Sequence, residues 1–229
     1  MKKIGILGGM SAVSTQIYYK NICDLTNQKL GNLNSPDMII RSLNFDPLAK
    51  YMHEDKWEEI AKVLNQEAQQ LEKSGADCII LATNTMHKLA DQMMHNINIP
   101  LLHIADATAN ELIKAKKSKP GFIATKFTMN ENFYTDRLIK KNLEPIIPNE
   151  TQRDEINKII FEELCINEIK SESIEKYIKV TDDLIKNGAD SLILGCTEVC
   201  LLLNSNNVKV PIFDTTKIHC EAAVNFAIQ

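Results

Sequence analysis

Two residues with reactive side chains occupy equivalent positions in a sequence that repeats itself. The segments Lys73–Leu81 and Lys186–Leu194 are identical at six of nine positions, at a constant offset of 113 residues. The same offset places Thr83 on Cys196. Each copy passes from a polar helix end through a glycine into a short apolar strand that stops in small polar residues. The repeat therefore predicts two equivalent strand ends, one with a hydroxyl and one with a thiol.

Cys196 is the strongest candidate for a reactive group. It lies in the predicted strand-to-helix turn Gly195–Glu198, with the sequence Gly-Cys-Thr-Glu. Free amides and the dipole at a helix start favour an anion. An unperturbed thiol has a pKa of about 8.5, which falls at helix N-termini, and the thiolate is the reactive species. A buried structural cysteine is the alternative, but the equivalence with Thr83 favours a reactive one.

Polar residues follow both positions. Asn84 and Thr85 come after Thr83, and Thr197 and Glu198 come after Cys196. Their amides and hydroxyls can hold the carboxylates of a small substrate. One acid/base on each side of a carbon atom is the arrangement that stereoinversion needs, because one group removes a proton and the other returns it from the opposite face.

Other residues allow weaker interpretations. Cys200 could form a redox or metal pair with Cys196, although its apolar neighbours favour a packed thiol. His87 could orient or protonate a group near Thr83, or it could simply cap a helix. His103 and His219 flank apolar stretches and are expected to be hydrogen-bonded residues behind a site. The glycine-rich start, Gly5 to Met10, lacks the third glycine of a dinucleotide fingerprint.

The element pattern predicts an α/β protein in which strands alternate with helices. Mainly parallel sheets with helices on both faces follow from this order. Right-handed crossovers place the strand C-termini on one rim, where ligands bind. We expect two pseudo-symmetric lobes, residues 1–98 with 208–229 and residues 99–207, with the active site in the cleft between them. Strands are predicted at 3–7, 37–43, 77–82, 100–104, 121–124, 144–147, 191–195 and 210–213. Helices are predicted at 14–25, 56–74, 86–95, 106–115, 132–141, 152–164, 174–186, 198–203 and 218–228.

The composition is that of a globular enzyme-sized chain. Its 229 residues are 44% hydrophobic and 24% charged, and the net charge of −4 gives no reason to expect nucleic acid or an anionic membrane as a partner. None of the six cysteines forms a CxxC pair, and no metal cluster is recognisable. Glycines interrupt the apolar N-terminal run, which argues against a secretion signal. No segment approaches the ~18–20 apolar residues of a membrane span. We therefore expect a cytoplasmic protein in a reducing compartment.

The chain resembles the aspartate/glutamate racemase family, whose cofactor-independent members use two thiols across a pseudo-twofold cleft. The matching segments run in order along almost the whole chain. They are Ile6–Met10, Thr83–His87, His103–Asp106, Thr128–Met129 with Phe133–Tyr134, Ile160–Glu163 and Gly195–Glu198.

Three departures from the family pattern stand out. The usual family residue before Asn-Thr is cysteine, whereas this chain has Thr83. With threonine at this position, the sequence resembles a subgroup described as broad-specificity racemases acting on L-aspartate and L-glutamate. The lysine that many members place after Glu163 is replaced by Leu-Cys-Ile at 164–166, and Ser-Ala at 11–12 stands where Gly-Pro is common.

The resemblance implies an amino-acid racemase without cofactor. Cys196 would take the α-proton of an L-amino acid, and Thr83 would return one from the other face. The resemblance also implies substrate contacts, largely through backbone, by a set of residues near the strand ends: Met10, Asn84, Thr85, Thr197 and Glu198. Met52 and Cys165 are weaker candidates for the side-chain end of the substrate. No lysine lies in a recognisable pyridoxal phosphate setting, and a homodimer is a family expectation.

Two alternatives remain from the sequence. One is a related enzyme of the wider superfamily, such as a hydantoin racemase, an arylmalonate decarboxylase or a maleate isomerase. The other is a small-molecule binding protein that has lost turnover, since one of the family's two thiols is missing.

Overall fold

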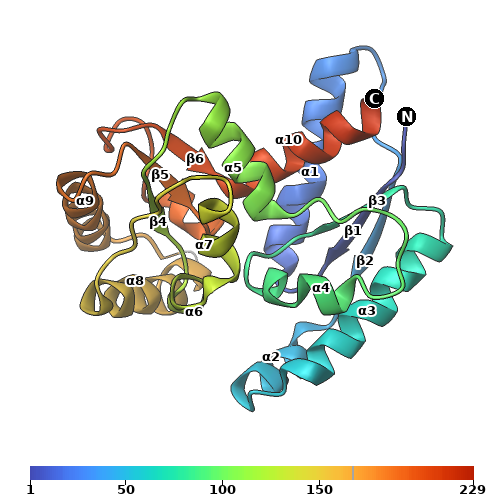
Figure 1. The fold of residues 1–229 in the computed structure, drawn as a ribbon, viewed down its shortest axis with the longest axis horizontal. Helices are drawn as coiled ribbons and strands as arrows, with labels where there is room; N and C mark the ends of the chain where they lie inside the picture. Colours follow the sequence, from blue (N-terminus) through green and yellow to red (C-terminus); the bar gives the residue numbers. More distant parts are fainter. Residues whose placement is uncertain (167) are drawn as a thin grey trace. The chain divides into compact units, whose positions relative to one another are not determined.

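The computed structural model describes residues 1–166 and 168–229, and for Glu198 the backbone alone. The chain divides into two compact units, residues 1–104 with 219–229 (unit 1) and residues 105–218 (unit 2). Each unit contains a three-stranded parallel sheet surrounded by helices, drawn in Figure 1. The predicted α/β class with parallel sheets is confirmed.

Unit 1 holds the sheet β2-β1-β3. Its elements are β1 (Ile4–Gly8), α1 (Ala12–Leu30), β2 (Met38–Ser42), α2 (Phe45–His53), α3 (Trp57–Lys73), β3 (Cys78–Leu81), the 3₁₀ helix η1 (Thr85–Leu89), α4 (Ala90–Met93) and most of α10 (Thr215–Ile228). Two helical layers cover the sheet, one on each face, and Figure 1 shows α1 and α10 on the side opposite α3.

The side chains of each strand in unit 1 alternate between the two faces of the sheet, which explains the two helical layers. Successive side chains of a strand point to opposite faces. Ile4 and Ile6 pack with Tyr18 and Ile22 of α1, in a cluster that also includes residues of α10. Leu7 joins the cluster formed with α2 and α3. Because both faces are buried, the strands read as continuous apolar runs.

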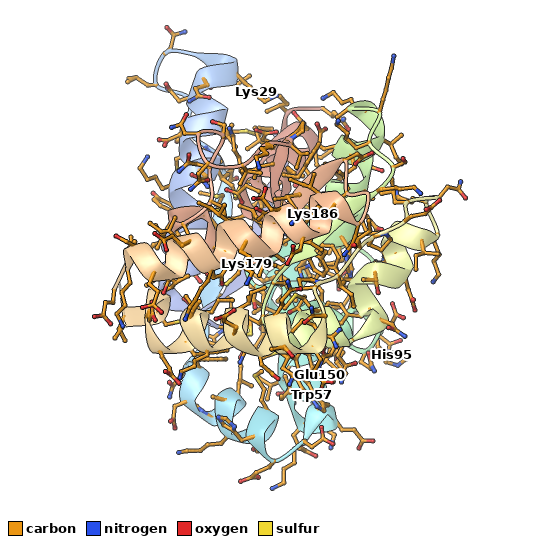
Figure 2. All side chains as sticks on the ribbon, turned by 90° about the vertical axis from the view of Figure 1, so that its left-hand side faces the viewer. Lys29, Trp57, His95, Glu150, Lys179 and Lys186 are labelled. Carbon is orange, nitrogen blue, oxygen red and sulfur yellow. The ribbon has the colours of Figure 1, made fainter. Side chains whose placement is uncertain are left out.

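Unit 2 holds the sheet β4-β5-β6. Its elements are most of α5 (Ile104–Lys114), β4 (Pro120–Ile123), α6 (Lys126–Asn130), α7 (Asn132–Ile139), α8 (Glu150–Glu162), the 3₁₀ helix η2 (Leu164–Ile166), α9 (Ser171–Lys186), β5 (Ser191–Leu194), the 3₁₀ helix η3 (Glu198–Leu201) and β6 (Ile212–Asp214). Helix α9 buries Tyr177, Val180 and Leu184, and carries the exposed Lys179 and Lys186 labelled in Figure 2.

The sequence repeat is also a structural repeat. The helix α3 is followed by Gly75 at φ 87° and α9 by Gly188 at φ 99°, the left-handed conformation common after a helix end. The next strands begin alike, because Asp77 accepts the amide of Lys3, and Asp190 accepts the amides of Ser118 and Lys119. The same local structure therefore leads into strand β3 in unit 1 and into strand β5 in unit 2.

Several predicted elements differ from the structure. Helix α2 was not predicted, although Asn44 caps it and Pro47 lies in its first turn. The segment predicted as a strand at 144–147 makes an isolated bridge, Ile146 to Gly121. The predicted helix 86–95 is the short pair η1 and α4.

The lobe boundaries proposed from the sequence stay a prediction, and the two units differ from them at two points. Strand β6 pairs with β5 within unit 2, since Leu192 lies opposite Ile212 in the parallel register. The first unit also extends to residue 104.

Candidate active site

The first candidate half-site lies at the carboxyl ends of β1 and β3 in unit 1. Leu7 and Leu81 are partners in the parallel register, so the loops that follow them leave the same edge of the sheet. The amide of Ala82 still donates to the carbonyl of Leu7, at 2.9 Å, immediately before Thr83. Thr83, and the predicted contacts Asn84 and Thr85, are partly exposed there.

The loop after β1 is held by its own polar groups. The amide of Gly9 donates to Oγ1 of Thr15 at 2.8 Å, and the Thr15 hydroxyl donates to the carbonyl of Ser11 at 2.9 Å. Ser11 also caps α1 by accepting the amide of Ser14. The side chain of Met10 packs into the core beneath α2 and α3, with the residue 6% exposed. A contact of Met10 with substrate would therefore use its backbone.

Gly9 is essential to this loop. Its φ is +85°, and a Cβ at this residue would lie 2.2 Å from both the amide nitrogen and the carbonyl oxygen of Leu43. We expect Gly9→Ala to lower the free energy of unfolding by about 3 kcal/mol or more, because backbone atoms cannot move aside as a side chain can. Urea denaturation measures the loss.

Gly75→Ala is the matched control for that substitution. Gly75 also has a positive φ, of +87°, but its nearest neighbour is the flexible ammonium of Lys3 at 4.0 Å. Its substitution should cost about 1 kcal/mol, the penalty for φ alone. Equal losses for the two variants would contradict the close approach of Leu43.

Three buried histidines lie behind the first half-site. His87 is 2% exposed, His103 5% and His219 0%. Burial lowers the pKa of His87 well below its usual value, and the neighbouring His103 and His219 lower it further. Burial also lowers the pKa of His219, to about 4. The sequence-based expectation was that His103 and His219 are hydrogen-bonded residues behind a site. His219 is hydrogen-bonded through both ring nitrogens, and the place of the two residues behind a substrate site stays a prediction.

The second candidate half-site lies at the carboxyl ends of β4 and β5 in unit 2. Ile123 pairs with Leu194, and the amide of Gly195 donates to the carbonyl of Ile123 at 2.7 Å. This bond is equivalent to that between Ala82 and Leu7 in unit 1. Cys196 follows and is partly exposed, as is Thr197.

The helix expected after Cys196 is only a single 3₁₀ turn. The segment η3 spans Glu198–Leu201, and the amide of Val199 in it donates to the carbonyl of Cys196 at 3.3 Å. A full α-helix dipole therefore does not stand behind the thiol, and that part of the sequence-based prediction was wrong. Cys200 points back to the same turn, with its Sγ 4.0 Å from the Cys196 carbonyl.

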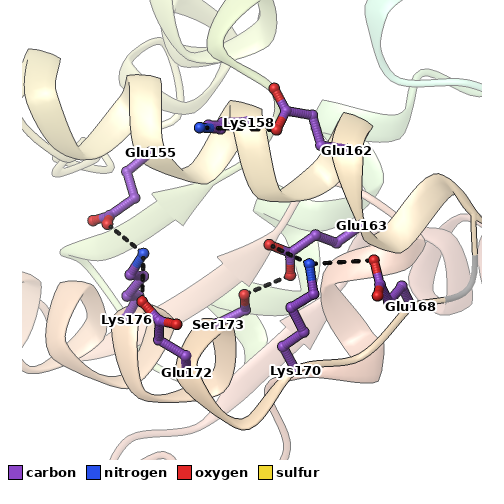
Figure 3. A network of polar contacts seen from close by, with 9 residues as sticks. All are labelled: Glu155, Lys158, Glu162, Glu163, Glu168, Lys170, Glu172, Ser173 and Lys176. Carbon is purple, nitrogen blue, oxygen red and sulfur yellow. Dashed lines mark hydrogen bonds and ion pairs between the residues drawn. The ribbon is translucent and has the colours of Figure 1, made fainter.

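A polar network on α8 and α9 lies in the same unit (Figure 3). Glu163 accepts the hydroxyl of Ser173 at 2.5 Å and forms an ion pair with Lys170 at 3.6 Å. Burial raises the pKa of Tyr177, and the charges of Cys196 and Glu163 raise it further. The hydroxyl of Tyr177 donates to the carbonyl of Ile156 at 3.3 Å.

Sequence reasoning missed Tyr177 and Ser173. Their positions on the buried side of the amphipathic α9 were the available signal, and that signal equally fits core packing.

The remaining predicted contacts are placed separately. Met52, on α2, is partly buried against the core of unit 1. Cys165 is exposed on η2, which packs against η3. The side chain of Glu198 lies outside the described part of the chain. The structure thus brings Met10 and residues 83–85 to one sheet edge, and Cys196 and Thr197 to another. That the two edges form one site stays a prediction.

No metal site accompanies these half-sites in the described residues. Within residues 1–166 and 168–229, no group of three or more His, Cys, Asp or Glu side chains is arranged to hold a metal ion.

The comparison with known proteins decides the family. Residues 7–223 match the sequence profile described as Asp/Glu/Hydantoin racemase. The chain belongs to this racemase family. Within it, the chain is 26% identical to the broad specificity amino-acid racemase RacX of Bacillus subtilis (strain 168), over 97% of this chain and 96% of RacX.

Solved structures of similar proteins agree with this membership. A protein of Yersinia pestis is 40% identical over 100% of both chains, with a TM-score of 0.97. An aspartate racemase homologue from Pyrococcus horikoshii OT3 is 35% identical over 100% of both chains, with a TM-score of 0.90.

The racemase family relationship fits a small-molecule substrate. Among the described residues of this family member, no helix combines the length and hydrophobicity that a membrane crossing requires.

Proposed function

We propose that the protein is a cofactor-independent amino-acid racemase for acidic substrates, L-aspartate and L-glutamate, with Cys196 and Thr83 as its two acid/base groups. The observation that carries the proposal is the equivalence of the two strand ends. Thr83 and Cys196 each come directly after the last hydrogen bond between two parallel apolar strands. The segments that end in these two residues are the two copies of the sequence repeat.

In the forward direction, the Cys196 thiolate takes the proton from the α-carbon of the L-amino acid. The C–H bond breaks, and its electron pair remains as a carbanion delocalised into the substrate carboxylate. Thr83 donates its hydroxyl proton to the opposite face, which forms the D-amino acid. Water protonates the Thr83 alkoxide, and the hydroxide that this leaves takes the proton of the Cys196 thiol, which restores the enzyme. Fixed backbone amides at the two strand ends would stabilise the developing charge.

The two groups have very different acidities. A free thiol has a pKa of about 8.5, so a thiolate is accessible near neutral pH, whereas a threonine hydroxyl is far harder to deprotonate. We therefore expect faster proton abstraction from L-amino acids than from D-amino acids. Initial α-hydrogen exchange in D₂O, followed separately for each enantiomer of a panel of amino acids without cofactor, measures this. Equal rates would contradict the assignment of Thr83, and no exchange from any amino acid would contradict racemase activity.

Thr83→Cys tests the same asymmetry from the other side. A second thiol should raise exchange from the D-enantiomer, because its thiolate is accessible near neutral pH whereas the alkoxide of Thr83 is not. If exchange falls for both enantiomers, Thr83 mainly positions the substrate.

The superfamily alternatives and a binding protein without turnover predict other results. A related decarboxylase or isomerase would show no exchange from the amino acids of the panel and would act instead on a non-amino-acid carboxylate tested beside them. A binding protein would change its melting temperature with ligand but show no exchange.

A further inference from the structure

The ring of His87 makes two different hydrogen bonds inside unit 1. Its Nδ1 lies 2.7 Å from the carbonyl oxygen of Thr83, and its Nε2 lies 3.4 Å from the amide of Ile104. A carbonyl only accepts and an amide only donates, so Nδ1 carries the proton and Nε2 is the acceptor. The two bonds therefore fix one neutral tautomer.

His219 makes a second pair of bonds in the same cluster. Its Nε2 lies 2.5 Å from the carbonyl of Leu102, and its Nδ1 lies 2.8 Å from the hydroxyl of Tyr18. The same reasoning makes Nε2 the donor and Nδ1 the acceptor. The rings of His87 and His219 are 5.7 Å apart, and that of His103 lies 4.5 Å from His87.

The cluster lies where the chain passes between the units. Unit 1 ends at Ile104 and resumes at His219. Ile104 donates to His87, and His219 is itself a member of the cluster. The ring that holds the Thr83 carbonyl thus also holds the residue at which the chain leaves unit 1.

We propose that His87 is a positioning residue for Thr83, which fixes the peptide of Thr83 to the two connections between the units through the buried histidine cluster. This inference rests on the proposed function, in which Thr83 is the acid/base for the D-enantiomer. His87 occupies the place that Cys200 occupies in the repeat, and both contact the carbonyl four residues before them. A hydrogen bond from a ring N–H to that carbonyl is much stronger than one from a thiol. The peptide of Thr83 is therefore held more rigidly than the peptide of Cys196.

Two substitutions separate the two bonds of His87. In His87→Asn the amide group reaches the place of Nδ1, so the donor to Thr83 is kept and the acceptor for Ile104 is lost. In His87→Gln the longer side chain brings its oxygen near the place of Nε2, so the acceptor for Ile104 is kept and the donor to Thr83 is lost. Both variants lose a buried ring, which makes each the control for the other's packing defect. His95→Gln, at an exposed histidine labelled in Figure 2, is the surface control.

The expected result is directional. His87→Gln should slow α-hydrogen exchange from the D-enantiomer about tenfold or more relative to exchange from the L-enantiomer, because a misplaced acid/base costs a large factor. His87→Asn should keep the ratio of D- to L-exchange within about twofold of wild type, because Thr83 stays in place in this variant. Protection of the Ile104 amide against hydrogen exchange should show the reverse order, with loss in His87→Asn only.

These measurements distinguish failure of this inference from failure of the proposed function. Equal D-to-L ratios in wild type, His87→Gln and His87→Asn would overturn the positioning role while leaving the racemase intact. If wild type exchanges no α-hydrogen, the proposed function fails, and the Ile104 amide still reports whether His87 anchors the connection. Unchanged protection of that amide in His87→Asn would overturn the anchoring role.

Discussion

Replacement of Cys196 by alanine is expected to lower racemisation in both directions by about 10³-fold or more, the upper part of the range for loss of a general acid/base. Every turnover of a two-base reaction uses both groups, so either direction stops when one is missing. Chiral chromatography of product from L- and from D-substrate measures the loss. The melting temperature should stay close to that of wild type, because Cys196 is partly exposed.

Cys200→Ala is the matched control for Cys196. Its sulfur lies at the same turn, 4.0 Å from the Cys196 carbonyl, yet it has no assigned role in proton transfer. The variant should keep activity within a few-fold. If Cys196→Ala retains a tenth of the activity, another group is the base on that face.

The sheet strands were predictable because their signals are local. The apolar runs at 3–7, 77–82 and 191–195 match strands buried on both faces, and the sequence repeat predicts that Thr83 and Cys196 follow equivalent strands. Helix α2 also carried a local signal, an asparagine cap with a proline in the first turn, which was overlooked. Boundaries moved by a few residues wherever caps, not periodicity, decide the helix end.

The surroundings of the two candidate residues were less predictable, because they are assembled from distant segments. Tyr18 and His219 are 201 residues apart in the sequence, and no local pattern in either segment predicts their hydrogen bond. The 3₁₀ turn after Cys196 differs from the expected helix for a similar reason. Its residues 198–203 are compatible with a helix, yet the 3₁₀ turn ends at Leu201, and Leu202 and Leu203 beyond it are buried. The apolar pattern of a strand predicts where the strand ends. It does not predict which polar side chains from distant segments lie behind that end.

Acidification between about pH 6.5 and pH 4 is expected to destabilise unit 1. The unfolded chain binds a proton at a histidine with a pKa of about 6.5, whereas burial holds the pKa of folded His219 at about 4. Above pH 6.5 both states are neutral at this residue and its stability contribution is complete. As the pH falls, only the unfolded state takes up the proton, so stability is lost. From this residue alone the loss at pH 4 is about 3 kcal/mol, and the low pKa of His87 adds to it.

Urea titrations followed by the fluorescence of Trp57, the single tryptophan, measure this loss, because Trp57 lies in unit 1 at the start of α3. The double variant Tyr18→Phe/His219→Gln removes the titrating ring, keeps a donor for the Leu102 carbonyl and leaves no hydroxyl in need of the lost acceptor. The slope of its stability against pH between pH 6.5 and 4.5 should be smaller than that of wild type, by up to one bound proton. The lowered pKa values of the Glu54 and Asp190 carboxyls place the loss of their own stability contributions at lower pH than that of His219. A slope unaffected by the double variant would mean that His219 is not kept neutral by burial, and the tautomer inferred for the cluster would then be wrong.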